Sequence, residues 1–189
     1  NPNRKPPPTP ETYLHACIHA FVAMVVTGAI LTFSFSEMAS AEAREHTALI
    51  EWFGYNNVCI VFDTPPSTYV CPMYWFVVGY LAVRFAVEDT EQRIMRMKNV
   101  SNMHKRLAGA ANALFALVCT FFSLCLAIRP EDDMITHASP FAALVLSLAV
   151  IYIFQYYQHN GKRKTSYTIA ILLYTAISIL KASFTIVAL

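Results

Sequence analysis

The chain has 189 residues, of which 56% are hydrophobic and only 14% are charged. Soluble globular domains carry about 25% charged residues, so this composition excludes an ordinary soluble domain and favours a membrane protein. The net charge of +2 gives no reason to expect a nucleic acid as a partner.

The chain begins with a Pro-rich, basic tail over residues 1–11, which we expect to be extended and polar. Residues 12–189 are predicted to form a single helical transmembrane bundle, so the expected fold class is all-α. Five apolar runs are long enough to cross a bilayer as helices. They cover residues 12–36, 69–87, 107–128, 138–158 and 166–189.

Basic and acidic loops alternate along the chain. Residues 37–63 hold five acids and one basic residue, and the turn after the third run holds three acids and Arg129. The connector between the second and third runs has five basic residues, and "GKRK" after the fourth run has three. Since lysine and arginine mark the inner side, the N-terminus is predicted to face the cytoplasm, or the matrix or stroma of an organelle.

The stretch "VCIVFDTPPSTYVC" contains two cysteines, Cys59 and Cys71. The predicted orientation places this stretch on the outer or lumenal side. A disulfide between Cys59 and Cys71 would stabilise the fold by about 2–4 kcal/mol, and a secretory route would favour it. In an organelle inner membrane the two cysteines would instead remain unpaired. Cys17, Cys119 and Cys125 lie within predicted spans, where we expect them to pack against neighbouring helices.

The histidines offer weak candidates for a cofactor site. His15 and His19 are four residues apart on one helical face, and His104 and His159 fall at helix ends on the same predicted side. No carboxylate is spaced with them as a metal-binding motif requires, and no Ser–His–Asp or Cys–His arrangement is recognisable. The expectation is therefore a protein without an enzymatic site, a metal or a cofactor.

Four side chains are candidates for contacts with lipid or a partner. Lys181 is the charge deepest in a predicted span, and intramembrane charges are costly unless they reach an interface or a partner. Arg84 lies within a turn of a span's end and can extend to the interface. Asn112, in the small-residue segment "AGAANALFA", can hydrogen-bond across helices, and His137 directly precedes the fourth run.

The stretches "CTFFSLCLAIRPEDDMITH" and "IYIFQYYQ" contain Cys119, His137, Tyr152 and Gln155 at spacings similar to those of the Frag1/DRAM/Sfk1 family. Within the segment "FDTPPST", residues 63–67 also resemble the outer segment that leads into the family's second span. Members of that family have six spans. The chain departs from the family pattern in three places. Ala138–Pro140 replace the glycines that follow the family's histidine, and no glutamate follows Pro66. The family's sixth span is missing from these 189 residues, so it is either lost or lies beyond them.

The resemblance implies a non-enzymatic integral membrane protein, structural or regulatory, that acts in lipid handling, autophagy or trafficking. Its location would be the plasma membrane, the Golgi or the lysosome, and its partners would include membrane lipids. The alternative is an accessory subunit of a large respiratory or photosynthetic complex in an organelle inner membrane, packed against other membrane-protein subunits. A third interpretation is a haem- or metal-binding subunit that uses His15 or His19 with His104 or His159.

Overall fold

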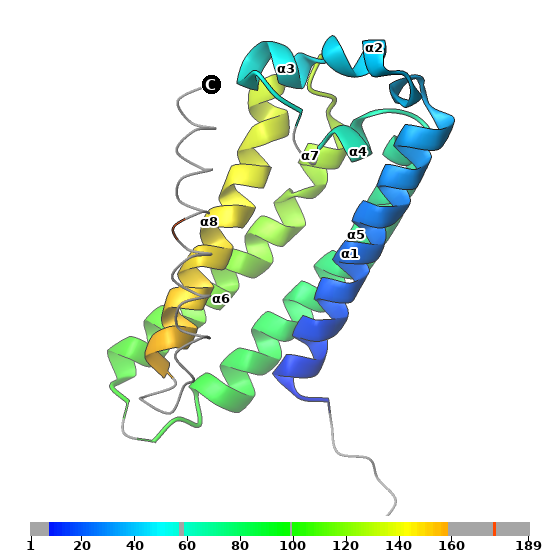
Figure 1. Cartoon of the computed structure of the whole chain (residues 1–189). Helices are drawn as coiled ribbons and strands as arrows, with labels where there is room; N and C mark the ends of the chain where they lie inside the picture. The colour runs from blue at the N-terminus through cyan, green and yellow to red at the C-terminus, as the bar shows by residue number, and fades with distance from the viewer. Residues whose placement is uncertain (1–7, 57–58, 99, 159–175, 177–189) are drawn as a thin grey trace, which may run out of the picture.

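Four long helices lie side by side in the computed structural model, which describes residues 8–56, 59–98, 100–158 and 176 (Figure 1). They are α1 (Pro10–Phe35), α5 (Ser67–Glu88), α6 (Asn102–Phe121) and α8 (Met134–Gln158). A π-helical turn, Asp89–Ile94, continues α5, and the short helix α7 (Ser123–Ala127) follows α6. Successive long helices run in opposite directions, so the bundle is up-and-down (Figure 1).

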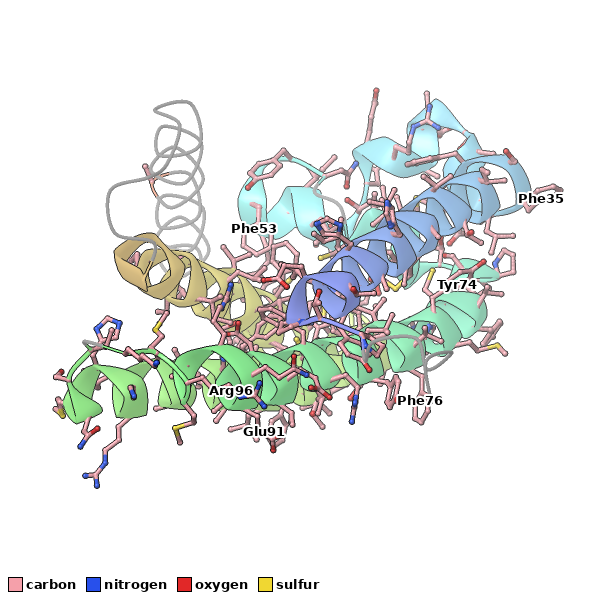
Figure 2. The ribbon with its side chains drawn as sticks, turned by 90° about the horizontal axis from the view of Figure 1, so that it is seen from below. Phe35, Phe53, Tyr74, Phe76, Glu91 and Arg96 are labelled. Carbon is pink, nitrogen blue, oxygen red and sulfur yellow. The ribbon has the colours of Figure 1, made fainter. Side chains whose placement is uncertain are left out.

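Each of these four helices, with α5 extended by its π-turn and α6 by α7, is long and apolar enough to cross a membrane. Large apolar side chains point away from the bundle, as Phe35 and Phe76 do (Figure 2), and Phe76 is 83% exposed. An exposed apolar surface of this kind is what a bilayer solvates. The all-helical class is confirmed, and each of the first four predicted spans falls on one of these candidate membrane-spanning helices. The fifth predicted span, 166–189, lies outside the described residues.

Short helices form a cap across one end of the bundle (Figure 1). We define the cap as residues 37–56 and 59–63. It contains a 3₁₀ turn (Glu37–Ala39), α2 (Ala41–Glu45), α3 (Ala48–Phe53) and α4 (Ile60–Asp63). The first three begin because a hydroxyl accepts a hydrogen bond from the backbone in the first turn, and the accepting residues are Ser36, Ser40 and Thr47.

A glycine lets α4 approach α1 closely. A Cβ at Gly28 would lie 2.6 Å from the Val61 carbonyl oxygen and 3.0 Å from the Cys71 sulfur. One turn further along α1, the buried Thr32 hydroxyl is 3.2 Å from the same carbonyl, to which it donates, and 2.9 Å from the Ser67 hydroxyl. Gly28 and Thr32 thus form a seat for α4 on α1, and this seat fixes the position of the cap's last helix.

We expect Gly28→Ala to lower the free energy of unfolding by about 1–3 kcal/mol, because its methyl group would overlap a backbone oxygen that cannot rotate away. Equilibrium unfolding in mixed micelles with an increasing fraction of denaturing detergent measures this change. Gly79→Ala is the matched control, since its Cβ would meet its nearest atom at 3.9 Å, an ordinary contact. Equal stability of the two variants would show that the close approach of α4 to α1 does not depend on Gly28.

Candidate functional site

A group of polar side chains is buried beneath the cap. Cys59 precedes α4, Asp63 ends it, Cys125 lies in α7 and His137 lies in the first turns of α8. Their exposed fractions are 3%, 9%, 1% and 1%. We call these four residues the cap cluster. Both α4 and α7 lie at the cap end of the bundle (Figure 1), so residues distant in the sequence meet there.

The atoms of the cap cluster face one another at short distances. One ligand atom each from Cys59, Cys125 and His137 lie within 4.8 Å of one another. Nε2 of His137 is 3.7 Å from Oδ1 of Asp63. Nδ1 of His137 is 2.7 Å from the Ile128 carbonyl oxygen, and because a carbonyl only accepts, Nδ1 carries the proton and donates. Nε2 then bears a lone pair in the neutral ring.

Two atoms of the cap cluster are buried without a hydrogen-bond partner among the described residues: Nε2 of His137 and Oδ2 of Asp63. Burial raises the pKa of Asp63 to about 7, although the nearby His137 opposes this shift. The pKa of Cys59 is raised well above its usual value by its hydrogen bond with Cys125 and by burial, so it is a thiol near neutral pH. The cluster therefore combines unsatisfied polar atoms with soft donor groups.

Local structure places two members of the cap cluster, Asp63 and His137. Asp63 is held by the seat of α4 on α1. His137 is placed by the start of α8, where Oδ1 of Asp133 accepts from the Thr136 backbone amide at 3.1 Å. The acidic turn that the sequence showed before this helix thus contains its N-cap.

The structure differs from the predicted Cys59–Cys71 pairing, because none of the five cysteines forms a disulfide. Cys71 is one turn into α5 and faces α1, with its sulfur 4.0 Å from the Met24 carbonyl oxygen. Cys59 directly precedes α4 and interacts instead with Cys125 and His137 of the cap cluster.

The prediction that His137 contacts lipid or a partner was wrong. Its side chain is 1% exposed and belongs to the cap cluster. Position before an apolar run indicated an interface, but His137 lies with Met134 and Ala138 on the buried face of the first turns of α8.

A second polar group joins the helices at the end opposite the cap. Nδ2 of Asn112 donates to Oδ2 of Asp89 at 2.8 Å and to the Thr90 hydroxyl at 3.1 Å. Asp89 also forms an ion pair with Arg93, which reaches Glu11 of α1 at 3.4 Å. We call Glu11, Asp89, Arg93 and Asn112 the Asp89 network. The predicted hydrogen bond of Asn112 across helices is confirmed.

The remaining charged candidates differ in their outcome. Arg84 forms an ion pair with Glu88 at 2.6 Å and a hydrogen bond with the Tyr13 hydroxyl at 3.2 Å. Its side chain is 39% exposed, which leaves it at the bundle surface. Lys181 lies outside the described residues.

The structure does not bring the weak cofactor candidates together in the part of the chain that it describes. His15 and His19 are exposed on α1, and His104 is half-buried at the start of α6. Neither they nor His104 belong to the one group of three close metal-ligand side chains found among the described residues, which is Cys59, Cys125 and His137. His159 lies outside the described residues.

A long groove follows the contact between α5 and α6. One part of about 550 Å³ lies toward the Asp89 network and another of about 410 Å³ lies toward the cap. Val83 and Thr120 line both parts, so the two parts adjoin. Small residues leave this space open, namely Gly79, Ala86, Gly109, Ala113 and Ala116. We call this feature the α5/α6 groove.

Comparison of the chain with protein-family models, with curated proteins and with solved structures gives no match. The site therefore has to be interpreted from its own chemistry. Sequence reasoning missed the cap cluster because Cys125 was assigned to helix packing. The available signal was position, because all four members fall near the predicted outer ends of apolar runs.

We expect Asn112→Leu to lower the free energy of unfolding by about 1–2 kcal/mol, because Asp89 would lose a buried hydrogen-bond donor. The same mixed-micelle unfolding measurement applies. Thr120→Val is the control on the same helix, since the exposed Thr120 hydroxyl donates only to its own helix, to Ala116 at 3.0 Å. An unchanged stability for Asn112→Leu would show that the Asp89 network does not hold α5 and α6 together.

Proposed function

We propose that this chain is a non-enzymatic integral membrane protein, structural or regulatory, which handles lipid by holding an anionic phospholipid along the α5/α6 groove. The observation that carries the proposal is the pair of adjoining, mainly apolar hollows between two helices that are long and apolar enough to cross a membrane.

The dimensions of the groove suit an acyl chain. Its lining on α5 runs from Trp75 to Glu91, which at 1.5 Å per residue is about 24 Å. The hydrocarbon core of a bilayer is about 30 Å thick, so the groove covers most of that depth. Half of the lining residues are alanine, glycine, valine or leucine, and three more are the aromatic residues Trp75, Phe76 and Tyr80, so the lining offers mostly apolar van der Waals contact.

The charge at one end of the groove suits an anionic headgroup. The lining ends at Thr90 and Glu91, and the connector that follows carries the exposed basic residues Arg96, Lys98 and Arg106. Glu91 and Arg96 are both found at this end of the bundle (Figure 2). Basic residues next to a membrane attract anionic lipid by about 1 kcal/mol each, so a phosphate at this rim would be held against the connector.

The same charges support an orientation with the N-terminus and the basic connector in the cytoplasm and the cap outside. In that orientation the basic rim meets the cytoplasmic leaflet, where anionic lipids are concentrated. A location in the plasma membrane, Golgi or lysosome, and membership of the Frag1/DRAM/Sfk1 family, are part of the same proposal and rest on the sequence.

The groove could also accept a neighbouring helix, as an accessory subunit of a larger complex would require. Gly109 and Ala113 are four residues apart on α6, a spacing of small residues that permits close helix packing. The basic rim favours lipid over a helix, because an apolar helix gains nothing from it.

A phospholipid with a photoactivatable acyl chain and an anionic headgroup tests the proposal. We expect crosslinks in peptides that contain residues 83–91 and 109–120, and we expect Ala113→Phe to reduce them severalfold. Ala113 is exposed in the groove, so a phenyl ring there would occupy the space of the acyl chain. Mass spectrometry of the crosslinked peptides is the measurement.

Leu114→Phe is the matched control for this experiment. Leu114 is 47% exposed on the same helix but does not line the groove, so the variant should keep the wild-type crosslinks. Crosslinks spread evenly over all helices, or unaffected by Ala113→Phe, would overturn the lipid proposal. Crosslinks between the groove and a co-purifying helix would favour the accessory-subunit alternative.

Glycosylation in endoplasmic reticulum microsomes tests the orientation. Glu45 is exposed in the cap, and Glu45→Asn creates a sequon with His46 and the existing Thr47. We expect this variant to gain a glycan, while Glu45→Gln and the native Asn99 sequon stay unmodified. Modification at Asn99 with none at position 45 would reverse the orientation.

A further inference from the structure

We propose that the cap cluster is a zinc site in which Cys59, Cys125 and His137 are ligands and Asp63 completes the coordination. The inference goes beyond the lipid function, because it concerns the opposite end of the bundle and different residues.

The spacing of the donor atoms is close to that of a tetrahedral zinc site. Zinc–sulfur bonds of about 2.3 Å place two coordinating sulfurs about 3.8 Å apart, and sulfur–nitrogen edges are slightly shorter. The three donor atoms here lie within 4.8 Å of one another. Shifts of roughly an ångström would therefore bring the three donor atoms to zinc-binding separation.

The histidine has the environment that a zinc ligand needs. A metal-bound imidazole normally donates its other N–H to a carbonyl or carboxylate, which fixes the tautomer. Nδ1 of His137 donates to the Ile128 carbonyl oxygen at 2.7 Å. Nε2 is left with its lone pair, fully buried, and without a hydrogen-bond partner among the described residues. A lone pair in this position is stabilised by a cation.

The carboxylate provides the second independent indication. Oδ1 of Asp63 is 3.7 Å from Nε2 of His137, and its other oxygen is buried with no hydrogen-bond donor in the described part of the chain. An isolated buried carboxylate is costly. Coordination of one oxygen to a metal ion would offset this cost and would place Asp63 as the fourth ligand beside Nε2.

The donor set selects zinc over other cations. Magnesium and calcium prefer oxygen ligands, whereas two sulfurs and one imidazole suit zinc, which accepts tetrahedral geometry. Binding two cysteines as thiolates releases two protons to solvent, and the two thiolates and the Asp63 carboxylate then carry three negative charges against the two positive charges of Zn²⁺. The net charge of −1 equals that of the isolated Asp63 carboxylate, so the bound metal adds no net charge beneath the cap.

Zinc at this position would join three segments that are distant in the sequence. Cys59 belongs to the cap, Cys125 to α7 and His137 to α8, whereas the seat on Gly28 ties the cap to α1. The metal would therefore link the cap to α7 and α8 at the upper end of the bundle in Figure 1.

The test uses the complete chain without a histidine tag, purified in detergent after growth with added zinc. We expect about one zinc ion per chain by elemental analysis, lost in both Cys59→Ser and Cys125→Ser. Cys71→Ser and Cys119→Ser are matched controls, because both cysteines are buried outside the cluster and should leave the zinc content unchanged. Cobalt(II) bound to the wild-type chain should show thiolate-to-metal charge-transfer absorption, which requires no variant to fold.

Three results would overturn the proposal. The first is a wild-type chain that binds neither zinc nor cobalt through thiolates. The second is a Cys59–Cys125 disulfide found by peptide mapping, since oxidised sulfurs cannot bind the metal. The third is zinc that persists in both serine variants, which would place the ion elsewhere on the chain.

Discussion

The contact of the Val61 carbonyl with Gly28 is the constraint on which the cap and its cluster depend. A backbone oxygen can approach a helix this closely only where no side chain intervenes, and the hypothetical Cβ distance of 2.6 Å shows that glycine is required. Because Thr32 hydrogen-bonds to the same carbonyl, the approach satisfies a buried acceptor as well. Asp63 and Cys59 flank this contact on either side along the chain, so their positions follow from it.

The polar residues lie at the two ends of the bundle, and this arrangement follows from the solvent. Hydrocarbon offers no hydrogen bonds, so each polar side chain within it needs a partner from the protein. The Asp89 network meets this requirement in part, with the Asp89–Arg93 ion pair and the Asn112 amide. Both groups still hold buried polar atoms without a hydrogen-bond partner among the described residues, such as Nε of Arg93 and Nε2 of His137. The cap cluster points to a metal ligand because its close donor atoms are two cysteine sulfurs and an imidazole nitrogen.

The sequence was sufficient to predict the helices but not to predict the contacts between them. Long apolar runs predicted α1, α5, α6 and α8 to within a few residues, since crossing a bilayer demands length and apolarity that few other structures share. The cap cluster was not predicted, because Cys125 in an apolar run is indistinguishable from a packing residue until α7 turns it toward Cys59. The disulfide prediction failed for a related reason. Separation along the chain indicated that Cys59 and Cys71 could meet, but it could not show that Cys59 interacts with Cys125 while Cys71 faces α1.

The α5/α6 groove is defined by polar contacts at both of its ends. Toward the cap, the Trp75 indole donates to the Cys119 carbonyl at 3.0 Å, and at the other end Asn112 donates to Asp89. Between these contacts, small residues allow the backbones of α5 and α6 to lie close together and leave the groove on the surface. Two directional contacts therefore set the separation of α5 and α6, while the apolar stretch between them carries no specific bond. An acyl chain that entered or left this stretch would break no specific bond between the two helices, as the proposed lipid function requires.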